Sequence, residues 1–207
     1  MECLGTNGND SVGSAEPIST FTNRRFEVMW VFGYGSLMWD EWEQQFGGQR
    51  VEGAVLDGYR RAFNKKSVEN WGTRHRPCPT LGLDKEAEAS CTGVAFRFVE
   101  ARRDAVWAYL RDREGPSFDL ETATVRLPDG RTVSALVAIN DPQAASYIGD
   151  RDRAELAAMI EGAEGTAGVC VDYLENTRSK LRALSITDPA VEALWDAVTR
   201  ERGGPVR

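Results

Sequence analysis

The chain is poor in histidine and has no glycine-rich phosphate motif. A single histidine, His75, stands among 207 residues, so any catalytic triad or dyad that needs histidine must use this one. It lies in a loop between Arg74 and Arg76, and we interpret His75 as a surface loop residue. Neither GxGxxG nor GxxxxGK followed by Ser or Thr occurs, which argues against the familiar nucleotide-binding loops.

The chain also has few cysteines and no long apolar run. Its four cysteines are scattered with no CxxC pair, so we expect neither a disulfide framework nor a zinc site. No apolar run approaches the roughly 20 residues that span a bilayer, and the N-terminus lacks a secretory signal. We therefore expect a cytoplasmic protein without a membrane partner. The cysteines are Cys3, Cys78, Cys91 and Cys170.

Acidic residues outnumber basic ones, and the net charge of −7 argues against nucleic acid as the main partner. Basic residues nevertheless crowd into one short region. This cluster is compatible with a solvated face, and also with a rim that attracts a small carboxylate-bearing substrate. Whether its arginines contact substrate is left open. The cluster contains Arg60, Arg61, Lys65, Lys66, Arg74 and Arg76.

The pattern of apolar residues predicts one domain, 27–207, preceded by a mobile tail, 1–26, that is rich in Gly, Ser, Thr and Asn. Strands are expected early: 28–32, then one or two within 51–63 broken at Asp57-Gly58, then 91–99. A helix over 100–113 and a hairpin of 122–127 with 132–139 follow, and the remainder is helical. The late helices cover 151–163 and 170–184, and a last one opens at Asp188-Pro189. The predicted class is α+β, a small mixed or barrel-like sheet with packed helices.

The first predicted strand ends in a turn of small residues, Gly33-Tyr34-Gly35-Ser36. Glycines permit backbone angles that are closed to other residues, so consecutive amides here could converge on a carboxylate or a developing oxyanion. A purely structural turn explains the same pattern equally well.

The octapeptide Trp30–Leu37, WVFGYGSL, resembles the signature of the ChaC family of γ-glutamyl cyclotransferases. Further segments are similar to family segments and follow in the same order, from about residue 28 to about residue 200. Three departures bear on the substrate more than on the reaction: Trp71 in place of an arginine, a displaced glycine after the loop proline, and a shorter stretch after Glu114. The similar segments are Gly72–Asp84, Ser90–Arg97, Tyr109–Glu114, Ser146–Gly149 and Asp172–Thr177.

The resemblance implies a γ-glutamyl cyclotransferase-like fold and an intramolecular aminolysis. The α-amine of a γ-glutamyl group attacks its own side-chain carbonyl, and glutathione would yield 5-oxoproline and Cys-Gly. Glu114 is implied as the general base and acid, and the end of the preceding helix should raise its pKa. Without the resemblance, Glu114 would be interpreted as a surface ion-pair partner.

The resemblance also implies a small-molecule substrate, no cofactor and no metal. The loop is expected to hold the glutamyl carboxylate or carbonyl oxygen, and Tyr147 either bonds to the substrate or simply packs. Two alternatives remain, namely the same chemistry on another γ-glutamyl compound and a non-catalytic binding domain of this fold. The expected substrate-binding residues are Val31, Phe32, Gly33, Tyr34, Gly35, Ser36, Leu37 and Tyr147.

Overall fold

A closed five-stranded barrel forms the centre of the computed structural model, which describes residues 28–114, 118–201 and 203. Strand order around the barrel is β1-β3-β2-β4-β5, and the parallel pairing of Val31 with Leu136 joins β1 to β5 and closes it. The predicted α+β class with a barrel-like sheet is confirmed, whereas the predicted tail 1–26 lies outside the described residues. The strands are β1 Val28–Gly33, β2 Gln49–Ser67, β3 Cys78–Val99, β4 Phe118–Arg126 and β5 Thr132–Asn140.

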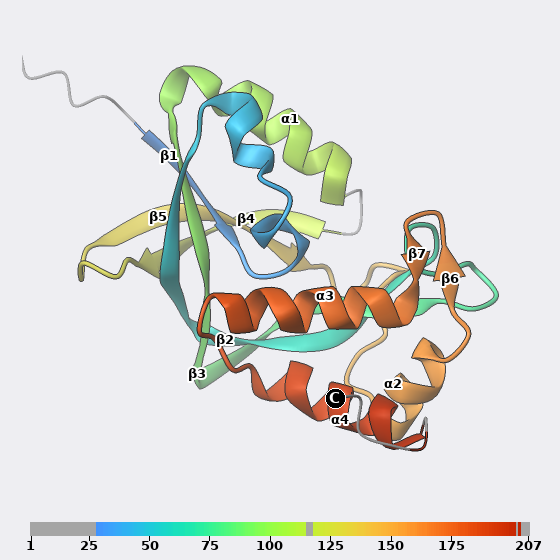
Figure 1. The fold of residues 1–207 in the computed structure, drawn as a ribbon. Helices are drawn as coiled ribbons and strands as arrows, with labels where there is room; N and C mark the ends of the chain where they lie inside the picture. The colour runs from blue at the N-terminus through green and yellow to red at the C-terminus, as the bar shows by residue number, and fades with distance from the viewer. Residues whose placement is uncertain (1–27, 115–117, 202, 204–207) are drawn as a thin grey trace, which may run out of the picture.

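Helices lie on two sides of this barrel (Figure 1). Helix α1 packs near one end, while α3 and α4 run together across the other half with α2 beside α4. The predicted helices and the predicted hairpin are present, with ends shifted by a few residues. The α-helices are α1 Arg103–Glu114, α2 Arg153–Ile160, α3 Cys170–Ala183 and α4 Pro189–Glu201; 3-10 turns are η1 Ser36–Met38, η2 Trp42–Phe46 and η3 Glu100–Arg102; a small ribbon joins β6 Glu164–Gly165 to β7 Gly168–Val169.

Strands β2 and β3 form a long antiparallel ribbon that the sequence pattern predicted only in part. The expected break at Asp57-Gly58 is wrong: β2 continues through it with a shift of register, and Gly58 takes a φ of 81° there. The first half of β3 was not predicted, because the exposed charged or small residues 85–88 interrupt the apolar pattern. Residues 78–85 are held both by backbone pairing to β2 and by buried side chains such as Leu81 and Leu83.

Aromatic packing attaches α1 to the barrel. Trp42 is fully buried and stacks on Tyr109 with ring centroids 5.2 Å apart, and its other neighbours include Phe96 and Phe98 of β3. Leu110 of α1 is also fully buried, in agreement with the predicted apolar side of this helix. The position of the C-terminal end of α1 is therefore set by packing against the barrel wall.

A buried arginine connects the loop after β1 to the C-terminal helix. Arg61 Nε donates to the Tyr34 carbonyl at 2.7 Å, and its terminal nitrogens reach Asp188 Oδ2 at 3.1 Å and the Thr92 carbonyl at 2.5 Å. Asp188 also accepts from the backbone amides of Ala190 and Val191, so it is the N-cap that the Asp-Pro pair predicted for α4. Both charged groups are satisfied by partners inside the protein.

Cys78 and Cys170 form a disulfide between the first residues of β3 and α3, with Cα atoms 5.6 Å apart. The expectation of no disulfide is thus wrong for this pair, because 92 residues separate the two cysteines and only the tertiary fold brings them together. Cys91 is buried and unpaired, and burial raises the pKa of its thiol to about 11. No helix in the described part of the chain combines the length and apolarity needed to cross a bilayer.

We expect Arg61→Met to lower the free energy of unfolding by about 3–5 kcal/mol, because it leaves the Asp188 carboxylate buried without its cation. Arg60→Met is the matched control. Arg60 is more exposed and pairs at the surface with Asp84 and Glu86, so its loss should cost no more than about 1 kcal/mol. Urea unfolding followed by tryptophan fluorescence measures both. Equal losses for the two variants would contradict the assigned role of Arg61.

Reduction of the Cys78–Cys170 bridge should destabilise the protein by roughly 2–5 kcal/mol, because the bridge closes a long loop in the unfolded chain. Thermal unfolding with and without dithiothreitol measures this effect. A Cys78→Ala/Cys170→Ala double variant should show the lower melting temperature in both conditions. If dithiothreitol lowered the melting temperature of this variant as much as that of the wild type, another thiol would be responsible.

Candidate active site

A cavity of about 690 Å³ opens beside the end of the barrel where the loop after β1 meets the last residue of α1. Its walls come from segments far apart in the chain: the loop 34–37, the end of β2 with residues 68–71, the end of α1, the start of β4, and α3. This volume is typical of a site for a small molecule. Closure of the barrel and packing of α1 and α3 against it bring these segments together.

The loop after β1 lines the cavity and carries unpaired backbone amides. Two contacts hold Tyr34 in place: its hydroxyl donates to the Ala138 carbonyl at 2.8 Å and its own carbonyl accepts from Arg61. Among the described residues, the amides of Gly35, Ser36 and Leu37 have no hydrogen-bond acceptor. Donors that are held rigidly and left unpaired at a cavity wall are suited to binding an anion or an oxyanion.

The structure brings four of the seven expected loop residues to the cavity. Tyr34, Gly35, Ser36 and Leu37 line it, whereas Val31 and Phe32 are buried in the barrel core and are not part of its wall. Gly33 lies outside the wall too, packed so closely that a Cβ would meet Leu37 and Phe96 at 3.0 Å. These three residues shape the strand that carries the loop, and direct substrate contact is not supported for them.

Tyr147 lies next to the site without lining it. It forms an isolated antiparallel bridge with Lys65, and the Lys66 amide donates to the Ser146 carbonyl at 2.8 Å. Ser146, not Tyr147, contributes to the cavity wall. Tyr147 is thus paired with the end of β2, and its contact with substrate stays a prediction.

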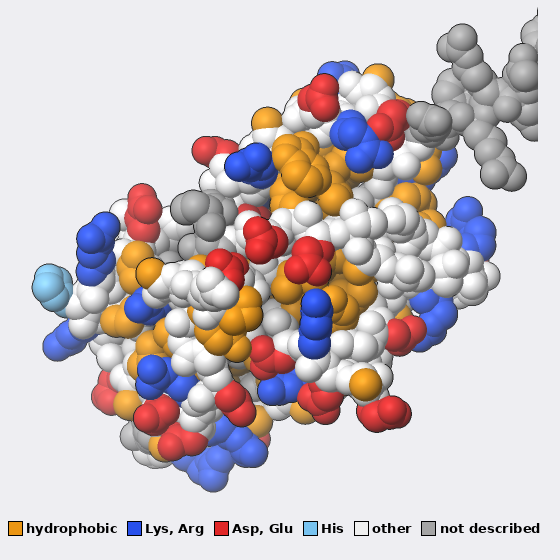
Figure 2. Space-filling view, turned by 180° about the vertical axis from the view of Figure 1, so that it is seen from behind, with side chains coloured by type: hydrophobic (Ala, Val, Ile, Leu, Met, Phe, Trp, Pro, Cys, Tyr) orange, Lys and Arg blue, Asp and Glu red, His pale blue; other side chains and the backbone are white. Residues whose placement is uncertain are grey.

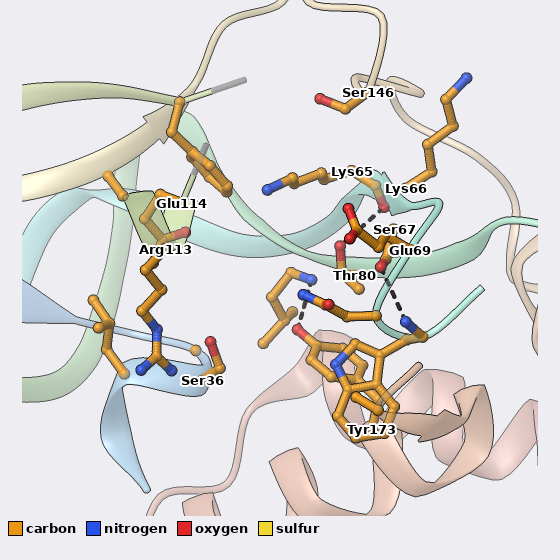
Figure 3. A pocket seen from close by; sticks show the side chains of 18 of the residues that line it. Ser36, Lys65, Lys66, Ser67, Glu69, Thr80, Arg113, Glu114, Ser146 and Tyr173 are labelled. Atoms are coloured by element: carbon orange, nitrogen blue, oxygen red, sulfur yellow. Dashed lines mark hydrogen bonds between the residues drawn. The ribbon is translucent and has the colours of Figure 1, made fainter. Parts of the chain in front are cut away.

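Glu114, the last residue of α1, reaches the cavity from the opposite wall (Figure 3). Burial raises the pKa of its carboxyl above the ordinary glutamate value; Lys65 and Arg113 lower it in part, and Asp40 raises it further. Arg113 is itself engaged, by an ion pair with Asp40 and a 2.8 Å hydrogen bond to the Tyr109 hydroxyl. The site therefore holds a carboxyl with increased basicity opposite a row of amide donors.

The arginines of the basic cluster do not line this cavity, but two lysines of the same cluster do. Arg61 is buried with its internal partners, Arg60 is paired with Asp84 and Glu86, and Arg74 and Arg76 are exposed on the loop before β3. Over the face shown in Figure 2, basic and acidic side chains of the described residues alternate without a continuous positive surface. The cluster is therefore divided between the core, the surface and the site.

Several aromatic side chains of the site were not predicted from the sequence to line it. Trp71 and Trp39 both pack near Tyr173, with ring centroids 5.6 Å and 6.3 Å from it, and all three line the cavity. The Tyr173 hydroxyl accepts from the Leu81 amide at 3.0 Å, and burial raises its pKa to about 12. The departure at Trp71 was the one signal in the sequence for this aromatic wall.

Lys65 projects from β2 into the cavity on the side of Glu114 (Figure 3). Its Nζ lies 3.5 Å from the centre of the Phe118 ring. Burial lowers the pKa of the Lys65 ammonium to about 8, and the nearby Glu114 carboxylate opposes this shift. Among described residues, no group of three or more His, Cys, Asp and Glu side chains is arranged to hold a metal ion.

Comparison with known proteins identifies the family. The model of the ChaC-like protein family matches residues 29–201, and the chain belongs to this family. It is 33% identical over 177 residues to the glutathione-specific γ-glutamylcyclotransferase of Escherichia coli K12, covering 83% of this chain and 73% of that protein. It is 32% identical over 181 residues to γ-glutamylcyclotransferase 2-3 of Arabidopsis thaliana, covering 83% and 88%.

Solved structures share the fold. A crystal structure of a yeast γ-glutamyl cyclotransferase specific to glutathione superposes with a TM-score of 0.76 at 20% identity, over 87% of this chain and 99% of that one. At this identity the likeness concerns the fold alone. The predicted γ-glutamyl cyclotransferase-like architecture is confirmed by it.

Proposed function

We propose that the protein is a γ-glutamyl cyclotransferase that cleaves glutathione to 5-oxoproline and Cys-Gly, with Glu114 as general base and acid. One observation carries this proposal: a carboxyl with a raised pKa lines a cavity of small-molecule size together with three loop residues whose backbone amides are unpaired. Relatives named as cyclotransferases of this type support the substrate. The reaction needs no cofactor, since nucleophile and electrophile belong to one molecule.

The proposed reaction begins with transfer of a proton from the substrate α-ammonium to the Glu114 carboxylate. The freed amine attacks the γ-carbonyl carbon, and a carbon–nitrogen bond forms while negative charge collects on the carbonyl oxygen. The amides of Gly35, Ser36 and Leu37 are placed to stabilise that charge. The bond to the cysteinyl nitrogen then breaks, and this nitrogen receives, through Glu114, the protons that the α-nitrogen has lost.

Folding the substrate into attack geometry accounts for much of the expected acceleration, because the two reacting groups are already joined by the glutamyl side chain. The aromatic side chains of Trp39, Trp71 and Tyr173 form one wall of the cavity in which the substrate would be held. We place the enzyme in the cytoplasm, where the glutathione pool is kept. There the Cys78–Cys170 bridge would be open to reduction by that pool.

Glu114→Gln should reduce formation of 5-oxoproline from glutathione by about 100- to 10,000-fold, since the amide cannot take up the ammonium proton. Asp112→Asn is the matched control, because Asp112 is an exposed acid of the same helix at the mouth of the same cavity. It should retain activity close to that of the wild type. Chromatography of 5-oxoproline and Cys-Gly gives the readout, and undiminished product from a folded Glu114→Gln variant would refute the assignment.

Substrate identity is tested by comparing kcat/KM for glutathione, γ-Glu-Cys and γ-Glu-Ala. We expect glutathione to be turned over best, since the cavity extends along residues 66–71, well beyond the volume that a γ-glutamyl unit fills. The same assay with wild-type protein distinguishes the alternatives. Preference for γ-Glu-Ala would point to another γ-glutamyl substrate, and no product from any of the three would indicate a binding domain.

On its acidic limb, the pH profile of kcat/KM should fall at a higher pH than it would if the base were a glutamate with an ordinary pKa. Glu114 acts in its ionised form, so activity is present above its pKa and is lost as the pH falls through it. Burial raises that pKa, which moves the limb upward. Measurement of kcat/KM for glutathione between about pH 4 and pH 8 locates the limb, and a profile that stays flat down to about pH 4.3 would contradict a raised pKa.

A further inference from the structure

Lys65 is a cation directed into the cavity without an ion-pair partner among the described residues. Arg113, the other cation deep in the cavity, is bound to Asp40, and Arg60 and Arg61 each have carboxylate partners elsewhere. The Lys65 ammonium instead lies over the Phe118 ring and experiences the Glu114 carboxylate beyond ion-pair distance. A partly desolvated charge is costly unless it is paired, so this position favours an anion that arrives with the substrate.

The backbone holds Lys65 firmly in this orientation. It pairs with Thr80 of β3 on one side and with Tyr147 on the other, so the end of β2 is fixed from both edges. Successive strand residues point in opposite directions, and Lys66 accordingly points away from Glu114 (Figure 3). Of two adjacent lysines, only Lys65 is therefore directed at the reacting end of the cavity.

Glutathione carries two carboxylates, and the proposed reaction decides between them. The α-carboxylate is attached to the same carbon atom as the amine that must reach Glu114. The glycyl carboxylate lies at the other end of the tripeptide. A cation directed toward Glu114 therefore lies near the α-carboxylate once the amine is in place. The glycyl end would extend past Lys66 and residues 67–71.

We propose that Lys65 forms an ion pair with the α-carboxylate of the γ-glutamyl group and thereby selects substrates in which this carboxylate is free. The proposal rests on the proposed function and assigns separate tasks to the two sides of the cavity. Lys65 holds the carboxylate, which leaves the amides of Gly35, Ser36 and Leu37 for the γ-carbonyl oxygen. The choice between carboxylate and carbonyl oxygen for this loop is resolved in favour of the oxygen.

Binding in a Glu114→Gln background tests the proposal without requiring turnover. Calorimetry compares glutathione, its α-carboxamide analogue and its glycyl-carboxamide analogue. We expect the α-carboxamide to bind about 10- to 100-fold more weakly than glutathione, since a hydrogen bond between charged groups is lost. Adding Lys65→Met should bring the ratio of the dissociation constants of α-carboxamide and glutathione close to one, because glutathione then loses the same partner. Adding Lys66→Met, the matched control, should leave the ratio unchanged.

The proposal would be overturned if the α-carboxamide still bound more weakly than glutathione, by the same factor, after Lys65→Met. A Lys65→Met effect confined to the glycyl-carboxamide ratio would also overturn it, since it would place Lys65 at the far end of the substrate. Absence of glutathione binding to the Glu114→Gln protein would overturn it as well. Failure of the proposed function is seen separately, as absence of 5-oxoproline from wild-type protein supplied with γ-glutamyl compounds.

Discussion

The buried guanidinium of Arg61 is the contact on which the geometry of the site depends. It binds the Tyr34 carbonyl in the loop, the Thr92 carbonyl in β3 and the Asp188 carboxylate at the start of α4. One rigid, planar side chain thus fixes three elements relative to one another. Because it holds the Tyr34 carbonyl, it also fixes the position of the following loop residues, which line the cavity.

The opposite wall is positioned by hydrophobic packing. Trp42 stacked on Tyr109 sets where α1 ends, and Glu114 is its last residue. Burial there raises the pKa of a carboxyl that is surrounded by both signs of charge, with Lys65 and Arg113 opposing the shift. The electrostatics of the proposed base therefore follow from packing some distance away, and the barrel provides a stiff frame for both walls.

Sequence periodicity predicted the elements whose burial follows a simple pattern. Helix α1, the β4–β5 hairpin and the Asp188 cap all have local signals, namely apolar spacing, a turn and a capping residue. The first half of β3 had none, since the exposed charged residues at 85–88 interrupt its apolar pattern. The Cys78–Cys170 contact was equally invisible, because no local rule joins residues so far apart.

By itself, the sequence determined the family, the strand that ends in the amide loop, and Glu114 as the candidate base, since these lie in continuous motifs. Tertiary structure alone decided which of those residues reach the cavity. Val31 and Phe32 are buried outside the cavity, Lys65 rather than the arginines beside it faces Glu114, and Tyr173 completes the wall. Alternation along a strand gives two faces, and only closure of the barrel and packing of the helices decide what each face contacts.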